Sequence, residues 1–221
     1  MRRRWVGAAI IGAMVLVTLI VWHGLPERIP THWNARGEVN GYSSRPLGAF
    51  LVPSIALVIW LLLPLLRKLD PRNANYERFD ETFFLIVNFM ILFMALMHGL
   101  MLGAALGWGV DMSRATLALI GFLFIVLGNF LPRIRSNWWM GVRTPWTLEN
   151  ERVWKETHRL AGWTFVAGGT VSVLSMFLPA PLRFPVGFAA LMCGGFVPVV
   201  WSYVLWRRYR DDEPVEGSAQ G

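Results

Sequence analysis

The sequence predicts an all-α membrane protein with six transmembrane helices and both termini in the cytoplasm. Of its 221 residues, 55% are hydrophobic and only 16% are charged, a composition typical of membrane proteins. Six apolar segments have about the length that a helix needs to cross a bilayer. These segments are 5–22, 47–66, 82–106, 115–131, 163–178 and 186–206.

Each of these segments should be helical, because only a helix satisfies its own backbone hydrogen bonds in lipid. The first follows three arginines and has no A-x-A-like cleavage pattern after it, so we expect an uncleaved span rather than a signal peptide. Pro53, Pro64 and Pro198 should kink their helices without ending them. The fifth segment is short, and the amphipathic stretch before it can lengthen that helix.

The orientation follows from the positions of the basic residues. We number the loops by the span that they follow. Only five of the 21 Lys and Arg residues lie in the odd-numbered loops, namely Arg28, Arg36, Arg45, Arg114 and Arg183. Basic residues concentrate on the cytoplasmic side, so the termini and the even-numbered loops should face the cytoplasm. The net charge of +7 is therefore expected of a membrane chain and does not indicate direct nucleic acid binding.

We divide the chain into four parts on this basis. Residues 1–66 hold the first two spans with the external loop 23–46, and residues 67–131 hold the third and fourth spans. Residues 132–206 hold a cytoplasmic stretch with the fifth and sixth spans. The polar tail 207–221 should be disordered.

The external loop 23–46 is rich in turn-forming residues, among them 34–37, and Asn40-Gly41 is a signal for a tight reversal. We expect a small ordered cap. His23 and His32 with Glu27 and Glu38 lack the spacing of a metal site, so no metal or other cofactor is predicted. Cys193 is the single cysteine, which excludes an intramolecular disulfide.

The third span carries two polar residues, Asn88 and His98, which should find partners on other helices. For His98 we favour a structural hydrogen bond over a proton-handling role. None of the spans has Asp, Glu, Lys or Arg away from its ends, which argues against an ion-coupled transporter. No catalytic motif is present, so an enzyme is not expected.

The stretch 129–162 is the longest interval in the C-terminal two thirds of the chain that is not simply apolar. Arg133 and Arg135 suit anionic lipid headgroups. A helix should begin near Pro145. Either Thr144 caps it with Pro145 in the first turn, or Thr147 caps it with Glu149 and Glu151 just inside, where acidic residues suit the helix dipole.

In that helix, the apolar side chains and the charged side chains fall on opposite faces. His158 lies at the boundary between the faces, where a packed histidine is commoner than a catalytic one. Arg143 lies in the preceding turn, with its guanidinium free to bridge carbonyls or carboxylates. The apolar face holds Val153, Trp154, Thr157, Leu160 and Ala161.

The run Asn-Trp-Trp-Met-Gly-Val-Arg-Thr-Pro-Trp-Thr-Leu at 137–148, followed by Val153-Trp154 and Thr-His-Arg-Leu-Ala-Gly at 157–162, resembles the signature of the SdpI family. These are multispanning bacterial membrane proteins named for immunity to a secreted peptide, the sporulation-delaying toxin. The matching signature positions are Asn137, Gly141, Arg143, Thr144, Pro145, Trp146, Thr147, Trp154, Thr157, His158 and Gly162. The external loop resembles the P-T-H-aromatic-N-x-x-G pattern that often precedes this signature. The matching positions there are His32, Asn34 and Gly37.

The resemblance implies an immunity and signalling protein of the bacterial cytoplasmic membrane. Its implied partners are the lipid bilayer, an extracellular toxic peptide and a cytoplasmic winged-helix repressor that is held at the membrane. Two alternatives remain open from the residues alone. One is a transporter or flippase for a small amphiphile or peptide, and the other is a membrane enzyme that uses Arg143 and His158.

Overall fold

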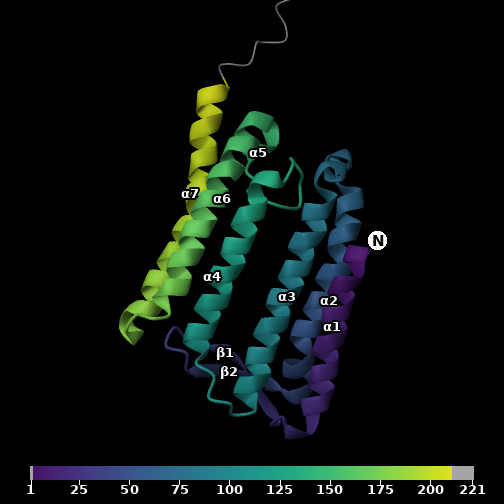
Figure 1. Cartoon of the computed structure of the whole chain (residues 1–221), viewed down its shortest axis with the longest axis vertical. Coiled ribbons are helices and arrows are strands. Elements are labelled where there is room, and N and C mark those ends of the chain that lie inside the picture. The colour runs from purple at the N-terminus through teal and green to yellow at the C-terminus, as the bar shows by residue number, and fades with distance from the viewer. Residues whose placement is uncertain (1, 211–221) are drawn as a thin grey trace, which may run out of the picture.

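The structure, a computed structural model, describes residues 2–210, with side chains from residue 5 onward. Long helices dominate it (Figure 1). They are α1 (Arg2–Val21), α2 (Arg45–Leu69), α3 (Asp80–Ala105), α4 (Met112–Phe130), α6 (Glu151–Ser175) and α7 (Ala180–Tyr209). Shorter elements connect them: η1 (Trp22–Gly24), β1 (Arg28–Trp33), β2 (Val39–Ser44), η2 (Asn73–Phe79), η3 (Leu131–Arg133) and α5 (Pro145–Glu149).

The long helices run alternately up and down and form two groups (Figure 1). Helices α1, α2 and α3 pack together, while α6 packs along both α4 and α7. The groups meet mainly where α3 contacts α4. The β-hairpin lies across one end of the bundle, and α5 with the loop 134–144 lies at the other, which we call the signature end.

Five of the long helices are long and apolar enough to cross a membrane, namely α1, α2, α3, α4 and α7. The chain is therefore a multi-pass membrane protein surrounded by a lipid bilayer. Helix α6 is less apolar because charged residues occupy its first turns, and the predicted sixth crossing stays a prediction. The structure joins the predicted amphipathic stretch and the short fifth segment into this one continuous helix.

Glycines allow α4 and α6 to approach each other closely. A Cβ atom on Gly121 would lie 2.6 Å from the carbonyl oxygen of Gly169, and one on Gly128 would lie 2.8 Å from that of Gly162. Small residues of this kind let the backbones of membrane helices touch. At Gly99 on α3, by contrast, a Cβ atom would meet nothing within 4 Å.

The predicted cap, loop 23–46, contains an antiparallel hairpin of β1 and β2, so the description all-α was incomplete. The predicted reversal at Asn40-Gly41 was wrong, because both residues lie inside β2. The chain turns at residues 34–38, where Asn34 accepts the backbone N–H groups of Arg36 and Glu38, and Gly37 has a φ of +81°. This pattern is an Asx turn, in which a side-chain oxygen replaces a backbone acceptor.

Two further boundaries differ from prediction. Thr144 caps the short helix α5, and a separate cap, Asn150, starts α6 by accepting the N–H groups of Arg152 and Val153. The alternative cap Thr147 was therefore wrong. The tail was predicted to begin at 207, but α7 continues to Tyr209; residues 211–221 lie outside the described part of the chain.

His98 has the partner on another helix that the sequence predicted. Its Nε2 lies 2.8 Å from the hydroxyl of Thr18 on α1, and this hydroxyl donates to the carbonyl oxygen of Met14 at 2.9 Å. Because the hydroxyl proton is used in that bond, the histidine donates from Nε2. The pair links α1 to α3 and fits the structural role.

Candidate functional site

The side chain of Asn137 forms the centre of the loop 134–144. It is completely buried. Its oxygen accepts the backbone N–H groups of Trp139 and Met140 at 2.8 and 2.7 Å. Its nitrogen donates to the carbonyl oxygens of Arg135 at 2.8 Å and of Met140 at 3.2 Å. One amide thus satisfies four backbone groups of a loop that has no regular secondary structure, as buried backbone requires.

A second buried group, Asp70, holds the loop from the connection between α2 and α3. Its carboxylate accepts the N–H of Trp138 at 2.9 Å and the hydroxyl of Tyr76 at 2.7 Å. The same hydroxyl lies 3.2 Å from the side-chain oxygen of Asn137. A buried carboxylate is stable only when hydrogen bonds replace its hydration, and these bonds do so.

Two more residues of that connection complete the attachment. The guanidinium of Arg72 donates to the hydroxyl of Ser136 and to the carbonyl of Leu148. The amide of Asn75 donates to the carbonyl of Ser136 at 2.8 Å. These hydrogen bonds attach the loop 134–144, which belongs to the group of α4, α6 and α7, to the group of α1, α2 and α3 at the signature end.

Helix α6 supports the loop from the opposite side with Trp154 and His158. The indole N–H of Trp154 donates to the carbonyl of Ile134 at 2.8 Å, and the imidazole stacks on the indole with centroids 4.1 Å apart. His158 donates from Nδ1 to the carbonyl of Trp154 and accepts the N–H of Val142 on Nε2 at 3.0 Å. Both ring nitrogens are therefore used inside the protein.

These bonds require a neutral imidazole, since Nε2 must carry a lone pair. Burial lowers the pKa of His158 to about 4, although the bond to Trp154 acts in the opposite direction. The sequence placed His158 at a boundary, but its exposed fraction is only 1%. This arrangement gives no support to the general acid–base role that the enzyme alternative assigned to it, because neither nitrogen is available to a substrate.

Gly141 is the position where the loop passes the imidazole. Its φ is +97°, a region that residues with a Cβ atom rarely adopt. A Cβ atom there would also lie 2.2 Å from Nε2 of His158. Both the backbone conformation and the close contact therefore require glycine.

Thr144 and Thr147 end the loop and start α5 with reciprocal hydrogen bonds. The N–H of Thr147 donates to the Thr144 hydroxyl at 3.2 Å, and the N–H of Thr144 donates to the Thr147 hydroxyl at 2.9 Å. The Thr147 hydroxyl also contacts the carbonyl of Val142, while that of Thr144 lies 3.0 Å from the Ser202 hydroxyl on α7. Pro145 follows at the first helical position, where its missing N–H costs nothing.

Arg143 is the signature residue with the most exposed functional group. It donates to the carbonyl of Trp138 at 2.8 Å and so closes the turn. A guanidinium has five N–H donors, and this bond uses one of them. Trp138 and Trp139 are 48% and 37% exposed beside it, and Trp146 is half-buried against Tyr203 of α7.

Thr157 and Gly162 complete the set on α6. Thr157 is fully buried, and its hydroxyl has no hydrogen-bond partner among the described residues. Gly162 faces Gly128 and Pro132. The structure thus brings all eleven predicted signature residues to one end of the bundle, most of them buried. The sequence missed Asp70, Tyr76, Arg72 and Ser136, although a carboxylate in an apolar chain was a usable signal for Asp70.

The three candidates of the loop 23–46, His32, Asn34 and Gly37, lie at the opposite end. His32 donates from Nδ1 to the side chain of Asn40, and Asn34 donates to Glu38 at 2.8 Å while it organises the turn. Gly37 approaches Ser113 at the start of α4, where a Cβ atom would lie 3.0 Å from the serine Cβ. Among the described residues, no group of three or more His, Cys, Asp or Glu side chains could hold a metal ion.

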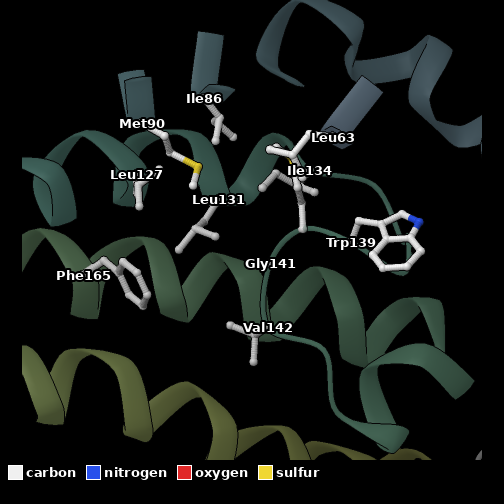
Figure 2. Close-up of a pocket in the computed structure, with 11 residues that line it drawn as sticks. Leu63, Ile86, Met90, Leu127, Leu131, Ile134, Trp139, Gly141, Val142 and Phe165 are labelled. Carbon is white, nitrogen blue, oxygen red and sulfur yellow. The ribbon is translucent and has the colours of Figure 1, made fainter. Parts of the chain in front are cut away.

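A cavity of about 270 Å³ lies directly beneath the loop (Figure 2). It is bounded by both helix groups and by the loop itself. Its lining residues are Leu63, Ile86, Met90, Leu127, Leu131, Ile134, Trp139, Met140, Gly141, Val142 and Phe165. Every one of them is apolar or aromatic.

Two parts of the chain match known protein families. Residues 133–202, which hold the loop, α5, α6 and most of α7, match the SdpI/YfhL protein family. Residues 9–57, which hold most of α1, the hairpin and the start of α2, match a domain of unknown function (DUF1648).

The chain is also similar to a curated protein, Immunity protein SdpI of Bacillus subtilis (strain 168). The two are 29% identical over 178 residues, which cover 80% of this chain and 83% of the relative. No solved structure matches the chain. The similarity thus extends over both helix groups and is not limited to the signature.

Proposed function

We propose that this chain is an immunity protein of the bacterial cytoplasmic membrane that protects its cell from a secreted toxic peptide. The observation that carries the proposal is the similarity to Immunity protein SdpI over four fifths of both chains. The hydrogen-bonded signature loop supports it, because a loop with so many buried polar contacts is more elaborate than a connector between two helices needs.

The orientation belongs to the same proposal. With the signature end in the cytoplasm, the basic residues of the even-numbered loops lie on the side where such residues concentrate. The hairpin then faces the outside, where it would meet the peptide first. His32, Asn34 and Gly37 are the residues we assign to that external surface, and they hold the turn of the hairpin in shape.

On the cytoplasmic side, the signature divides into two sets of residues with different tasks. The buried set, with Asn137, Trp154 and His158 at its centre, fixes the shape of the loop. The exposed set consists of Arg143 and the neighbouring tryptophans. Arginine and tryptophan are common anchors of protein interfaces, so we assign docking of a cytoplasmic repressor to this exposed set.

Survival under toxin challenge tests the function. Toxin-sensitive cells that produce the full chain should survive peptide concentrations that kill cells with an empty vector. Equal killing of both strains, with the protein present in the membrane fraction, would overturn the immunity role. A fluorescently labelled winged-helix repressor should move to the membrane on challenge; if it stays in the cytoplasm, the signalling part of the proposal is wrong.

A further inference from the structure

The cavity beneath the signature loop has the size and the lining of a site for a single alkyl chain. Its volume of about 270 Å³ lies just below the roughly 300–1,000 Å³ of sites for drug-sized ligands. It lies at the signature end of the bundle, between Leu63 and Ile86 of one helix group and Leu127 of the other (Figure 2).

The charges around the cavity indicate the rest of the ligand. Ile134 lines the cavity, and its two neighbours in the sequence, Arg133 and Arg135, are both exposed. Within the described residues, neither arginine forms an ion pair, and the guanidinium of Arg133 lies over the ring of Phe130. Two cations of this kind suit a phosphate-containing headgroup at the membrane surface.

We propose that the cavity binds one acyl chain of an anionic membrane lipid, whose headgroup contacts Arg133 and Arg135. An acyl chain is the most abundant apolar group around a membrane protein. It brings no backbone N–H or C=O group into the apolar space, whereas an inserted peptide segment would have to satisfy such groups. The proposal does not depend on the immunity role.

The bound chain would support the loop. Trp139, Gly141 and Val142 form the loop side of the cavity, so a lipid there stabilises the same segment that Asn137 and His158 hold. A ligand that binds only the folded state raises the temperature of unfolding. The lipid should therefore be detectable both by its retention and by its effect on stability.

The test uses the full chain purified in detergent and titrated with phosphatidylglycerol or with phosphatidylcholine of the same acyl chains. Native mass spectrometry counts the bound lipids, and thermal unfolding is followed in parallel. We expect one phosphatidylglycerol to be retained in preference to phosphatidylcholine and to raise the unfolding temperature. No retained lipid, or equal retention of the two lipids, would overturn the proposal.

Two variants locate the site. Leu63→Trp should fill the cavity and abolish retention, while the matched control Leu62→Trp changes a neighbouring residue that is 43% exposed and should retain the lipid. The double variant Arg133→Gln/Arg135→Gln leaves the core untouched and should weaken phosphatidylglycerol binding roughly 25-fold, at about fivefold for each charge. Retention in Leu63→Trp equal to that in Leu62→Trp, or an unchanged affinity in the double variant, would refute the assigned site.

Discussion

The neutral state of His158 predicts a specific dependence of stability on pH. In the folded protein the pKa of His158 is about 4, whereas an exposed histidine has a pKa near 6.5. Protonation therefore favours the unfolded state. The contribution of this residue to stability is fully present above pH 6.5, falls as the pH drops, and is lost once the pH passes below about 4.

The magnitude follows from the difference between the two pKa values. Each unit corresponds to about 1.4 kcal/mol, so the full loss is about 3 kcal/mol, and about 2 kcal/mol of it should appear between pH 7 and pH 4.5. His158→Gln removes the titrating group. Its side-chain amide can still accept a hydrogen bond from Val142, but the variant loses the stacking on Trp154.

The assay is reversible unfolding in detergent at pH 7 and pH 4.5, for the wild type and for His158→Gln. Other groups titrate in both proteins, so the quantity of interest is the difference between their pH dependences. The wild type should lose about 2 kcal/mol more than the variant over this interval. Equal losses would show that His158 is not held neutral by the loop, and the account of the site would be wrong.

Two substitutions test the same loop without a change of pH. Gly141→Ala should destabilise the protein by about 3 kcal/mol, because a Cβ atom combines backbone strain with an overlap on His158. The control Gly99→Ala, at a position without close neighbours, should leave the unfolding temperature unchanged or slightly raised. Similar unfolding temperatures for the two variants would contradict this reasoning. Trp154→Phe should lower the free energy of unfolding by about 2 kcal/mol, since the buried carbonyl of Ile134 loses its hydrogen-bond donor. A free energy of unfolding that differs from the wild-type value by only a few tenths of a kcal/mol would refute the importance of that bond.

The helices were the most predictable part of the fold. Apolar segments of spanning length appear in the structure as long helices. The residues that the helical periodicity placed on the apolar face of the helix after residue 150, such as Val153, Thr157 and Ala161, are buried. These features depend on local periodicity and length, which a single sequence contains. The hairpin was missed because Pro30 lies inside β1 and bulges interrupt the register, so the usual alternation of a strand is absent.

The signature residues could be identified from their resemblance to a family, but their roles could not. Asn137 acts on backbone groups of its own loop, and its contact with Tyr76 joins residues that are 61 positions apart. The same holds for Asp70 and Trp138, which are 68 positions apart. Contacts of this range depend on how the two helix groups meet. The periodicity of a single helix also could not show that the loop 134–144 covers His158.

We infer that the buried signature residues shape the loop 134–144 and that its exposed edge acts in immunity. The most direct test is survival under toxin challenge of cells that produce Arg143→Ala, measured with the amount of folded protein in the membrane. We predict normal amounts of this variant and loss of protection, while Arg143→Lys restores it at most in part because an ammonium lacks the planar fork. Full protection by Arg143→Ala at wild-type amounts would contradict the account.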